Sequence, residues 1–353
     1  MLICLITLGL ACASCVSDPA ANGKGAAGKV KNIIILIGDG MGPVHEDAGR
    51  NAKGAPLVWD GFEYHAMVYT GSLTTIYAYS PTDSAASATA IATGEKTANG
   101  LIGMDVFERI EYDNIMKIAK DKGRATGVVT SDRLSGATPA SFSAHAGSRN
   151  REEDIVLAQA RSGVDLLMGA NSAVLSEYIG EFTERGYVPY ETLYEAEQTG
   201  GRVIGLFPAV TPTGGETGET LQNMTVFALE YLSRSRTGFV LMIEGAKIDQ
   251  GSSEMNLDFM LSEFAAFEEC ARIVSDWAKE NGETMVIVTA DHETGGLAFS
   301  DDGYLFTSGG NHTNTEVNCH ITWPFEYSPF DAYLKDGRID NTDLFRIMYS
   351  AIQ

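Results

Sequence analysis

Short apolar runs rich in β-branched residues recur along this chain, and they constrain its fold more than any other feature. The first run, Asn32–Gly38, reads NIIILIG. A strand without polar alternation is typical of a parallel sheet that is buried on both faces. Similar runs follow at Ala125–Thr130, Val164–Met168, Val203–Phe207, Phe239–Ile243 and Met285–Thr289.

Helical patterns lie between and after these runs. They are found at Tyr112–Lys122, Glu152–Ser162, Leu221–Ser233, Met255–Asn281 and Thr342–Ile352. Strands that alternate with helices predict an α/β fold with a mainly parallel sheet. The 353 residues, 44% of them hydrophobic, would suggest two domains by length alone. No Pro/Ser-rich linker and no charge run divides the interior, so we predict one large domain over residues 30–353.

The N-terminal residues read as an export leader. Leu2–Leu10 is almost wholly apolar, is followed by small residues, and is too short to span a bilayer. Residues 18–29 are rich in Ala and Gly, so we interpret residues 1–29 as a leader and flexible tether. Cys15 or Cys12 could carry a lipid, as in a bacterial lipoprotein, or cleavage could release a soluble product. Either reading places the protein in the bacterial periplasm or on a membrane facing the periplasm or the exterior.

The net charge limits the possible binding partners, and the cysteine content limits the possible disulfides. The formal net charge of -22 argues against binding to nucleic acid or to acidic membranes. Behind the leader, only Cys270 and Cys319 remain. They could form a disulfide in an oxidising compartment, or they could be two buried thiols.

Acidic side chains follow three of the expected strands. In open parallel sheets, ligands bind beyond the carboxyl ends of the strands, so these positions are where chemistry is expected. Clustered carboxylates repel one another, and folding them together implies cations between them. The residues are Asp39 after the first run, Glu244 and Asp249 after Phe239–Ile243, and Asp291 and His292 after Met285–Thr289.

A small-residue segment, Pro81–Ala88, leads into an Ala-rich stretch that should be helical to about Ala92. Ser84 would then lie at the helix N-terminus, where free N–H groups and the helix dipole favour a serine alkoxide or a phosphate. A plainer reading is that Thr82, Asp83 or Ser84 is only an N-cap, and that the small residues allow close helix packing.

Several motifs in a fixed order resemble those of the alkaline phosphatase family over nearly the whole chain after the leader. The motifs are Gly38-Asp39-Gly40-Met41-Gly42, Asp83-Ser84-Ala85-Ala86-Ser87, Ala137-Thr138-Pro139-Ala140, Ala144-His145 with Ser148-Arg149, Glu244-Gly245-Ala246 with Ile248-Asp249, Asp291-His292-Glu293-Thr294-Gly295-Gly296 and Asn311-His312-Thr313. The resemblance implies a three-layer α/β/α sandwich, which agrees with the strand and helix patterns.

The resemblance also implies two zinc ions and one magnesium ion. One zinc ion would be held by Asp39, Asp291, His292 and the Ser84 oxygen. Aspartate and histidine are common zinc ligands, and a bound zinc lowers the pKa of a coordinated hydroxyl. Arg149 would grip the phosphate oxygens, because its planar fork matches two of them.

The second zinc ion would be held by Asp249 and His312. Magnesium would bind Asp39 as a bridge, together with Thr138 and Glu244, since hard oxygen ligands suit this ion. Three divalent ions would also explain how so acidic a chain can bind a phosphate anion.

The reaction implied by the resemblance is hydrolysis of phosphate monoesters in two steps. Ser84 is phosphorylated first, and water then hydrolyses the phosphoserine. A homodimer is the family habit. Two alternatives stay open, namely a phosphodiesterase or sulfatase on the same scaffold, and a weakly active protein that binds phosphate or metal.

Two departures from the family pattern motivate the second alternative. Ser253 stands where the family has a histidine ligand of the second zinc ion. That site is therefore expected to bind zinc more weakly than a site with three protein ligands. Glu254 or His320 are the candidates to compensate. Gly136 stands where relatives often carry Asp or His near magnesium, so the magnesium site is expected to be looser.

Overall fold

The computed structural model describes residues 30–196, 201–215, 218–326, 328, 330, 333 and 337–353. The expected leader and tether, with Cys12 and Cys15, lie outside the described residues. Within those ranges, none of the helices has the length and apolar character needed to cross a membrane.

A ten-stranded sheet forms the centre of the molecule, with strand order β14-β2-β13-β8-β1-β7-β3-β4-β6-β5. Its pairs are parallel except for those of β13, which runs antiparallel to β8 and β2. Two short hairpin-like pairs, β10 with β11 and β9 with β12, lie outside the sheet. The strands are β1 Asn32–Gly38, β2 Tyr64–Tyr69, β3 Ala125–Arg133, β4 Leu166–Ala170, β5 Tyr187–Tyr190, β6 Arg202–Phe207, β7 Phe239–Gly245, β8 Thr284–Thr289, β9 Glu293–Thr294, β10 Leu297–Ser300, β11 Gly303–Phe306, β12 His312–Thr313, β13 Val317–Thr322 and β14 Arg338–Asp340.

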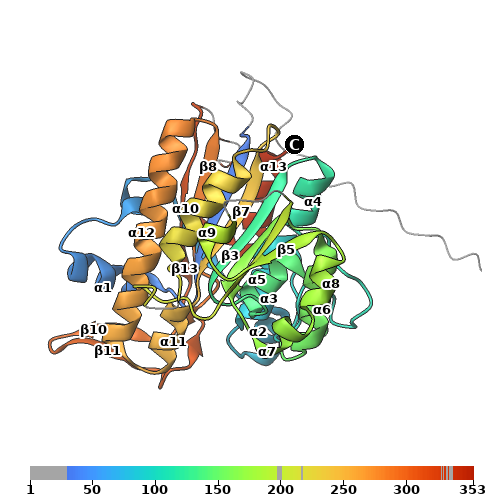
Figure 1. Cartoon of the computed structure of the whole chain (residues 1–353). Helices are drawn as coiled ribbons and strands as arrows, with labels where there is room; N and C mark the ends of the chain where they lie inside the picture. The colour runs from blue at the N-terminus through green and yellow to red at the C-terminus, as the bar shows by residue number, and fades with distance from the viewer. Residues whose placement is uncertain are drawn as a thin grey trace, which may run out of the picture.

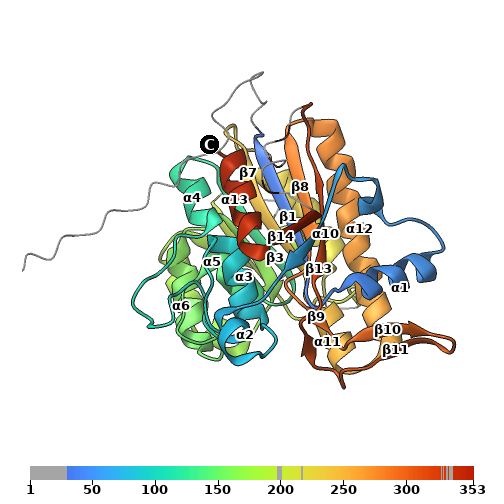
Figure 2. The ribbon, with the colours of Figure 1, turned by 180° about the vertical axis from the view of Figure 1, so that it is seen from behind.

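Helices cover both faces of the sheet. In Figure 1, α10 and α12 lie across the near face, and Figure 2 shows α3, α4 and α13 on the other face. The architecture is therefore the expected three-layer α/β/α sandwich. The helices are α1 Pro43–Lys53, η1 (3-10) Val58–Gly61, α2 Leu73–Ala78, α3 Ser84–Thr93, α4 Ile115–Asp121, α5 Ala137–Ser143, α6 Glu152–Ser162, α7 Ala173–Glu177, α8 Ile179–Thr183, α9 Leu193–Ala196, α10 Leu221–Leu232, α11 Lys247–Ser253, α12 Leu257–Asn281 and α13 Asn341–Ala351.

The apolar runs form the middle of the sheet. Strand β1 has both ends as predicted, and every one of its residues is buried. The other five runs are strands whose ends differ from the prediction by a few residues. Helix α6 has the predicted ends, whereas several other helices start where a side chain caps them rather than where the apolar pattern begins. For example, α4 begins at Ile115 because Asn114 accepts a hydrogen bond from the Lys117 amide.

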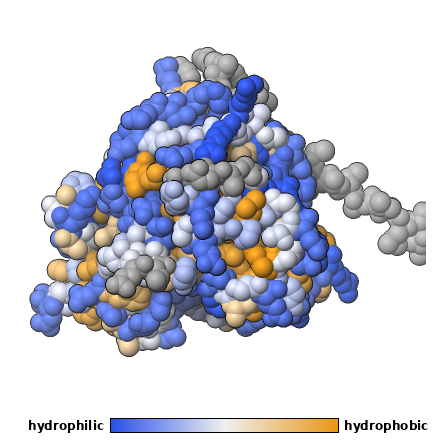
Figure 3. All heavy atoms as spheres, viewed as in Figure 1, coloured by the Kyte–Doolittle hydropathy of each residue, from blue (hydrophilic) through white to orange (hydrophobic). Residues whose placement is uncertain are grey.

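Both mature cysteines are free and buried, so the disulfide alternative is wrong in this structure. Cys270 lies on α12 and Cys319 on β13. Burial raises the pKa of the Cys270 thiol to about 12, so this thiol stays protonated. The outer surface seen in Figure 3 is mainly hydrophilic with scattered apolar patches, as suits an acidic chain.

Candidate active site

The three strands that carry acidic side chains at their ends are neighbours, in the order β8-β1-β7. Ile37 of β1 lies opposite Glu244 on one side and Thr289 on the other. The carboxyl ends of these strands therefore bring Asp39, Glu244 and Asp291 to one edge of the sheet, as the sequence predicted. The nine predicted site residues meet at this edge: Asp39, Ser84, Thr138, Arg149, Glu244, Asp249, Asp291, His292 and His312.

The first group of ligands surrounds the imidazole of His292. Its Nε2 lies 3.1 Å from Ser84 Oγ, 3.3 Å from Asp291 Oδ2 and 3.5 Å from Asp39 Oδ1. Both of these carboxylate oxygens are buried and make no hydrogen bond within the described structure. The other oxygen of Asp291 accepts the amides of Gly40 and His292, which fixes its direction. Two carboxylate oxygens and one imidazole nitrogen facing one point fit a divalent metal ion.

The protonation of the carboxyl groups depends on their burial and on how close they lie to one another. Burial, followed by the negative charges of Asp291, Asp249 and Glu244, raises the pKa of Asp39 well above its usual value. Burial is also the main cause that raises the pKa of Glu244 to about 8. Cations bound between these carboxyl groups would favour their ionised forms.

Ser84 is the first residue of α3, and the adjacent Asp83 is the N-cap. Asp83 does more than cap the helix. One of its oxygens accepts the amide of Ala86 at 3.0 Å, while the other accepts the amide of Gly100 and pairs with the Arg149 guanidinium at 3.1 Å. Asp83 thus holds Arg149 beside the serine. The sequence pattern had suggested only capping for it, and its position next to Ser84 was the available signal.

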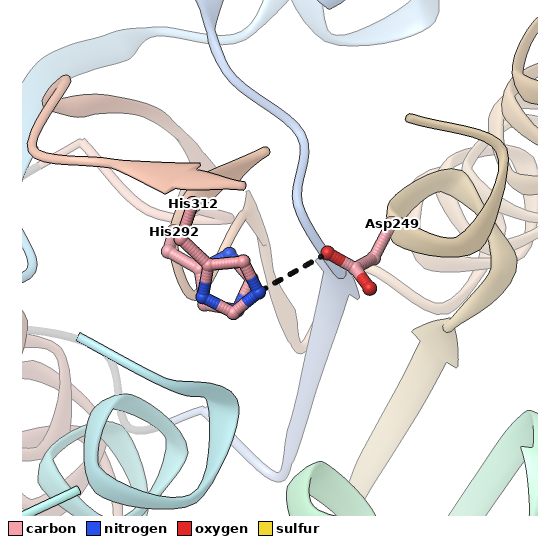
Figure 4. A group of neighbouring side chains, drawn as sticks. All are labelled: Asp249, His292 and His312. Carbon is pink, nitrogen blue, oxygen red and sulfur yellow. Dashed lines mark ion pairs between the residues drawn. The ribbon is translucent and has the colours of Figure 1, made fainter. Parts of the chain in front are cut away.

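The second group consists of Asp249, His292 and His312, whose ligand atoms lie within 4.8 Å of one another. Figure 4 shows the two imidazole rings overlapping, with Asp249 facing them from α11. The ring centroids are 3.7 Å apart. His312 Nδ1 lies 2.9 Å from the Thr82 carbonyl oxygen, and its Nε2 lies 3.5 Å from Asp249 Oδ1. The Nδ1–H donates to that carbonyl, so Nε2 remains available as a ligand.

Asp249 differs from the first group in its protonation. Burial would raise its pKa, but the hydrogen bond to His312, the charge of His292 and the hydrogen bond from Thr294 outweigh burial and lower it to about 2. The Thr294 hydroxyl donates to Asp249 and also lies 3.3 Å from His292 Nδ1, so it links both groups. The sequence analysis gave Thr294 no role, although it lies within the Asp291–Gly296 motif.

The structure places the two compensation candidates differently. Ser253 and Glu254 line the same cavity as Asp249. Glu254 accepts a hydrogen bond from Gln250 and belongs to neither ligand group. His320 is turned away from the site, because its Nδ1 lies 2.7 Å from His65 and its Nε2 lies 3.1 Å from Glu46. The suggestion that His320 completes the second zinc site is therefore wrong.

A third set of oxygens, from Asp39, Thr138 and Glu244, fits magnesium. Thr138 Oγ1 is buried and makes no hydrogen bond of normal geometry in the described residues, although it lies near enough to Glu244 to lower that pKa slightly. The cavity beside this set measures about 510 Å³. Gly136 lines the cavity and offers no side chain to it. A buried hydroxyl without a hydrogen-bond partner beside a buried carboxylate fits the oxygen ligands that a hard cation prefers.

Comparisons with known proteins agree with this geometry. The chain matches the alkaline phosphatase family over residues 30–174 and 187–351. It is 33% identical over 303 residues to alkaline phosphatase 3 of Bacillus subtilis (strain 168), covering 79% of this chain and 64% of that protein. It therefore spans slightly less than two thirds of the length of that relative. It is 32% identical over 415 aligned positions to alkaline phosphatase of Escherichia coli (strain K12), covering 91% and 86% of the two chains.

Solved structures show the same fold. Alkaline phosphatase from the Antarctic bacterium TAB5 superposes with a TM-score of 0.80 at 27% identity, covering 92% of this chain and 98% of that one. A variant of the TAB5 enzyme with Mg bound in its M3 site gives a TM-score of 0.79 at 26% identity over the same shares. With the family matched over most of its described length and its motifs gathered at one edge of the sheet, this chain belongs to the alkaline phosphatase family.

Proposed function

We propose that this protein hydrolyses phosphate monoesters, with Ser84 as the nucleophile. One observation carries the proposal. The Ser84 hydroxyl lies at a buried helix N-terminus, 3.1 Å from His292 Nε2 and beside Asp39 and Asp291, each of which has a buried oxygen with no hydrogen-bond partner among the described residues. Arg149 is held next to it by Asp83. Ser84 can act as a nucleophile, the carboxylates beside it can bind cations, and Arg149 can bind an anion. These three functions at one place fit the transfer of a phosphoryl group.

Metal ions belong to this proposal. The donor sets fit zinc in the group of Asp39, Asp291 and His292, a second zinc at Asp249 and His312, and magnesium at Thr138 and Glu244 with Asp39. The TAB5 variant with Mg in its M3 site supports the last assignment. When bound, such ions lower the pKa of the serine hydroxyl and neutralise the charge of the phosphate.

The chain's own residues perform the remaining tasks. The Ser84 oxygen forms a bond to phosphorus as the ester oxygen leaves with its electron pair, which gives a phosphoserine and an alcohol. A water molecule then forms a new bond to phosphorus and releases Ser84 and inorganic phosphate. Free amide N–H groups at the start of α3 and the Arg149 guanidinium stabilise the phosphoryl oxygens during both steps.

Arg149 also bears on the class of ester. A monoester presents two charged non-bridging oxygens beyond the one at the metals, and a guanidinium fork matches them. A diester replaces one of these charges with a second organic group. The diesterase and sulfatase alternatives are therefore not favoured.

The direct test is release of phosphate from an aryl phosphate at alkaline pH, with zinc and magnesium added. Ser84→Ala should abolish turnover, while Ser80→Ala, an exposed serine in the preceding segment, should retain it. Trapping a phosphorylated protein by acid quench should succeed only when Ser84 is present. Full activity of Ser84→Ala would refute the mechanism.

We also propose an exported protein and a homodimer, from the N-terminal pattern and the family habit. Cell fractionation and the intact mass of the isolated protein would show whether Cys12 or Cys15 carries a lipid or whether the leader is cleaved. Light scattering at micromolar concentration would give the number of chains. A protein that remains in the cytoplasm would refute export, and a monomer would refute the dimer.

A further inference from the structure

Strand β3 is irregular at its carboxyl end, next to the site. Val129 pairs with Met168 of β4, but the next paired residue, Arg133, lies opposite Ala170. Four steps along β3 therefore correspond to two steps along β4. Such bulges redirect side chains and are frequent beside active sites. The residue inside this one that carries an ionisable group is Asp132.

Asp132 shares a cavity with two members of the magnesium set, Asp39 and Glu244. Its side chain is half-buried and lines the same cavity as Asp39, Glu244 and Gly136. The negative charge of Asp132 contributes to the raised pKa of Glu244, as expected for a close neighbour. Neighbouring like charges repel one another, and a cation between them removes this repulsion.

No basic side chain within the described parts of the chain forms an ion pair with Asp132. Its carboxylate makes no hydrogen bond or ion pair with the described residues, and only its backbone amide is bonded, to Thr130 Oγ1. The three basic side chains of the cavity have other partners. Lys247 Nζ donates to the Val210 carbonyl, Arg133 lies 4.0 Å from Glu152, and Arg149 pairs with Asp83.

Position 136, which lines the same cavity as Asp132, has no side chain that could serve as a ligand. Gly136 is the N-cap of α5 and brings no side chain, while the buried Thr138 hydroxyl in the first turn of α5 makes no hydrogen bond of normal geometry among the described residues. We infer that Asp132 is a further carboxylate of the magnesium site, which the β3 bulge supplies in place of a side chain at position 136. Magnesium keeps several of its waters, so this carboxylate can hold the ion directly or by accepting from those waters.

This inference rests on the proposed function, because it concerns the magnesium ion of that site. Its test is calorimetric titration of MgCl2 into the zinc-loaded full chain, which measures binding without turnover. Asp132→Asn should weaken magnesium binding by roughly 10- to 100-fold, the usual effect of removing a supporting carboxylate. The matched control is Glu254→Gln, which removes one negative charge from the same cavity and should leave the affinity unchanged.

Moving the carboxylate gives a second, independent check. In the Asp132→Asn background, Gly136→Asp should restore at least part of the lost affinity, whereas Gly136→Asn should not. A Cβ at position 136 would lie 3.0 Å from the Arg133 carbonyl oxygen, so both substitutions require the same small backbone shift. Only the negative charge distinguishes them.

The outcomes separate the two proposals. Weakened binding in Asp132→Asn with rescue by Gly136→Asp supports the inference. Equal affinity of Asp132→Asn and wild type overturns it, while Ser84-dependent phosphate release can still stand. Wild-type protein that binds zinc and releases phosphate but takes up no magnesium overturns both the magnesium assignment and the inference. Equal weakening by Glu254→Gln would show a general charge effect and would also overturn it.

Discussion

The two halves of the site are built differently, although they share His292. Asp291 and His292 are fully buried around Ser84, whereas Asp249 and His312 have side chains that are 25% and 27% exposed. The pKa values of Asp39, beside Ser84, and of Glu244, in the adjoining magnesium set, are raised, whereas that of Asp249 is lowered. A bound cation would therefore favour the ionised forms of Asp39 and Glu244, while the histidine neighbours of Asp249 already favour its ionised form.

This difference indicates which half of the site the fold holds more rigidly. The first half is preformed by buried strand ends and needs metal to offset repulsion. The second half depends on a short helix, α11, and on a loop histidine, and it has Ser253 where the family has a third ligand of its own. His292 can offer its Nε2 to one ion only, so two filled sites leave the second with Asp249 and His312.

The largest expected effect is a difference in kcat between variants of His292 and of His312. His292→Ala removes the group nearest to Ser84 and should lower kcat by roughly 10³-fold or more, whereas His312→Ala should cost less, because its site is already incomplete. Steady-state kinetics and zinc content per chain would measure this. Equal losses in both variants would break the distinction between the halves.

The stability of the metal-free protein should depend on pH through Glu244 of the magnesium set. The folded pKa of Glu244 is raised from 4.5 to about 8, so its contribution is fully present below pH 4.5 and is lost as pH rises through about 8. Metal-free protein should therefore unfold at a lower temperature at pH 9 than at pH 6. Zinc and magnesium should protect it most at pH 9.

Thermal unfolding in EDTA across pH 6 to 9 tests this dependence. Glu244→Gln should flatten the slope, because glutamine has a similar shape and cannot ionise. Asp249→Asn should keep most of it, because the lowered pKa of Asp249 makes its contribution disappear only as pH falls through about 2. A slope that persists in Glu244→Gln would assign it to another group.

Substitution of Arg149, the residue proposed to bind the phosphate oxygens, tests whether the residues around Ser84 also determine the class of substrate. Arg149→Ala should lower kcat/KM for an aryl phosphate by roughly 10²-fold, a typical cost for losing one charged group that stabilises the transition state. Its effect on a phosphodiester should be small. Asp83→Asn should give a milder loss by freeing Arg149, and a diester activity that falls equally would contradict the monoester assignment.

The smallest expected effect is a gain in zinc affinity. Ser253→His adds the ligand that the second half lacks and should raise zinc affinity there by about 10-fold. Competition with a chelator would measure the affinity, and Ser253→Ala is the control for loss of the hydroxyl. An affinity that does not change would show that another group already completes the site.

Much of the fold could be predicted from the sequence, because the signals were local. The six apolar runs became central strands, since only burial on both faces accommodates them. Four strands of the large sheet, β2, β5, β13 and β14, were not predicted. Strands β5 and β14 are short, β2 is partly exposed, and the pairing of β13 with β2 and β8 joins segments that are not adjacent in the sequence.

The site residues could be listed from the motifs, but their partners could not. Asp83 could be identified only as a cap, and its ion pair with Arg149 joins residues that are distant in sequence. His320 was a candidate ligand until the structure placed it against His65 and Glu46. Residue type alone does not tell where a histidine points.

By itself, the sequence determined the α/β class, the parallel centre of the sheet and the family. These follow from periodicity and from short motifs, which depend on neighbours along the chain. Only the tertiary structure decided that β8, β1 and β7 lie side by side, that both cysteines stay free and that Asp132, at the irregular end of β3, lines the same cavity as Asp39 and Glu244. Contacts between distant segments are set by packing and by the repulsion and pairing of buried charges.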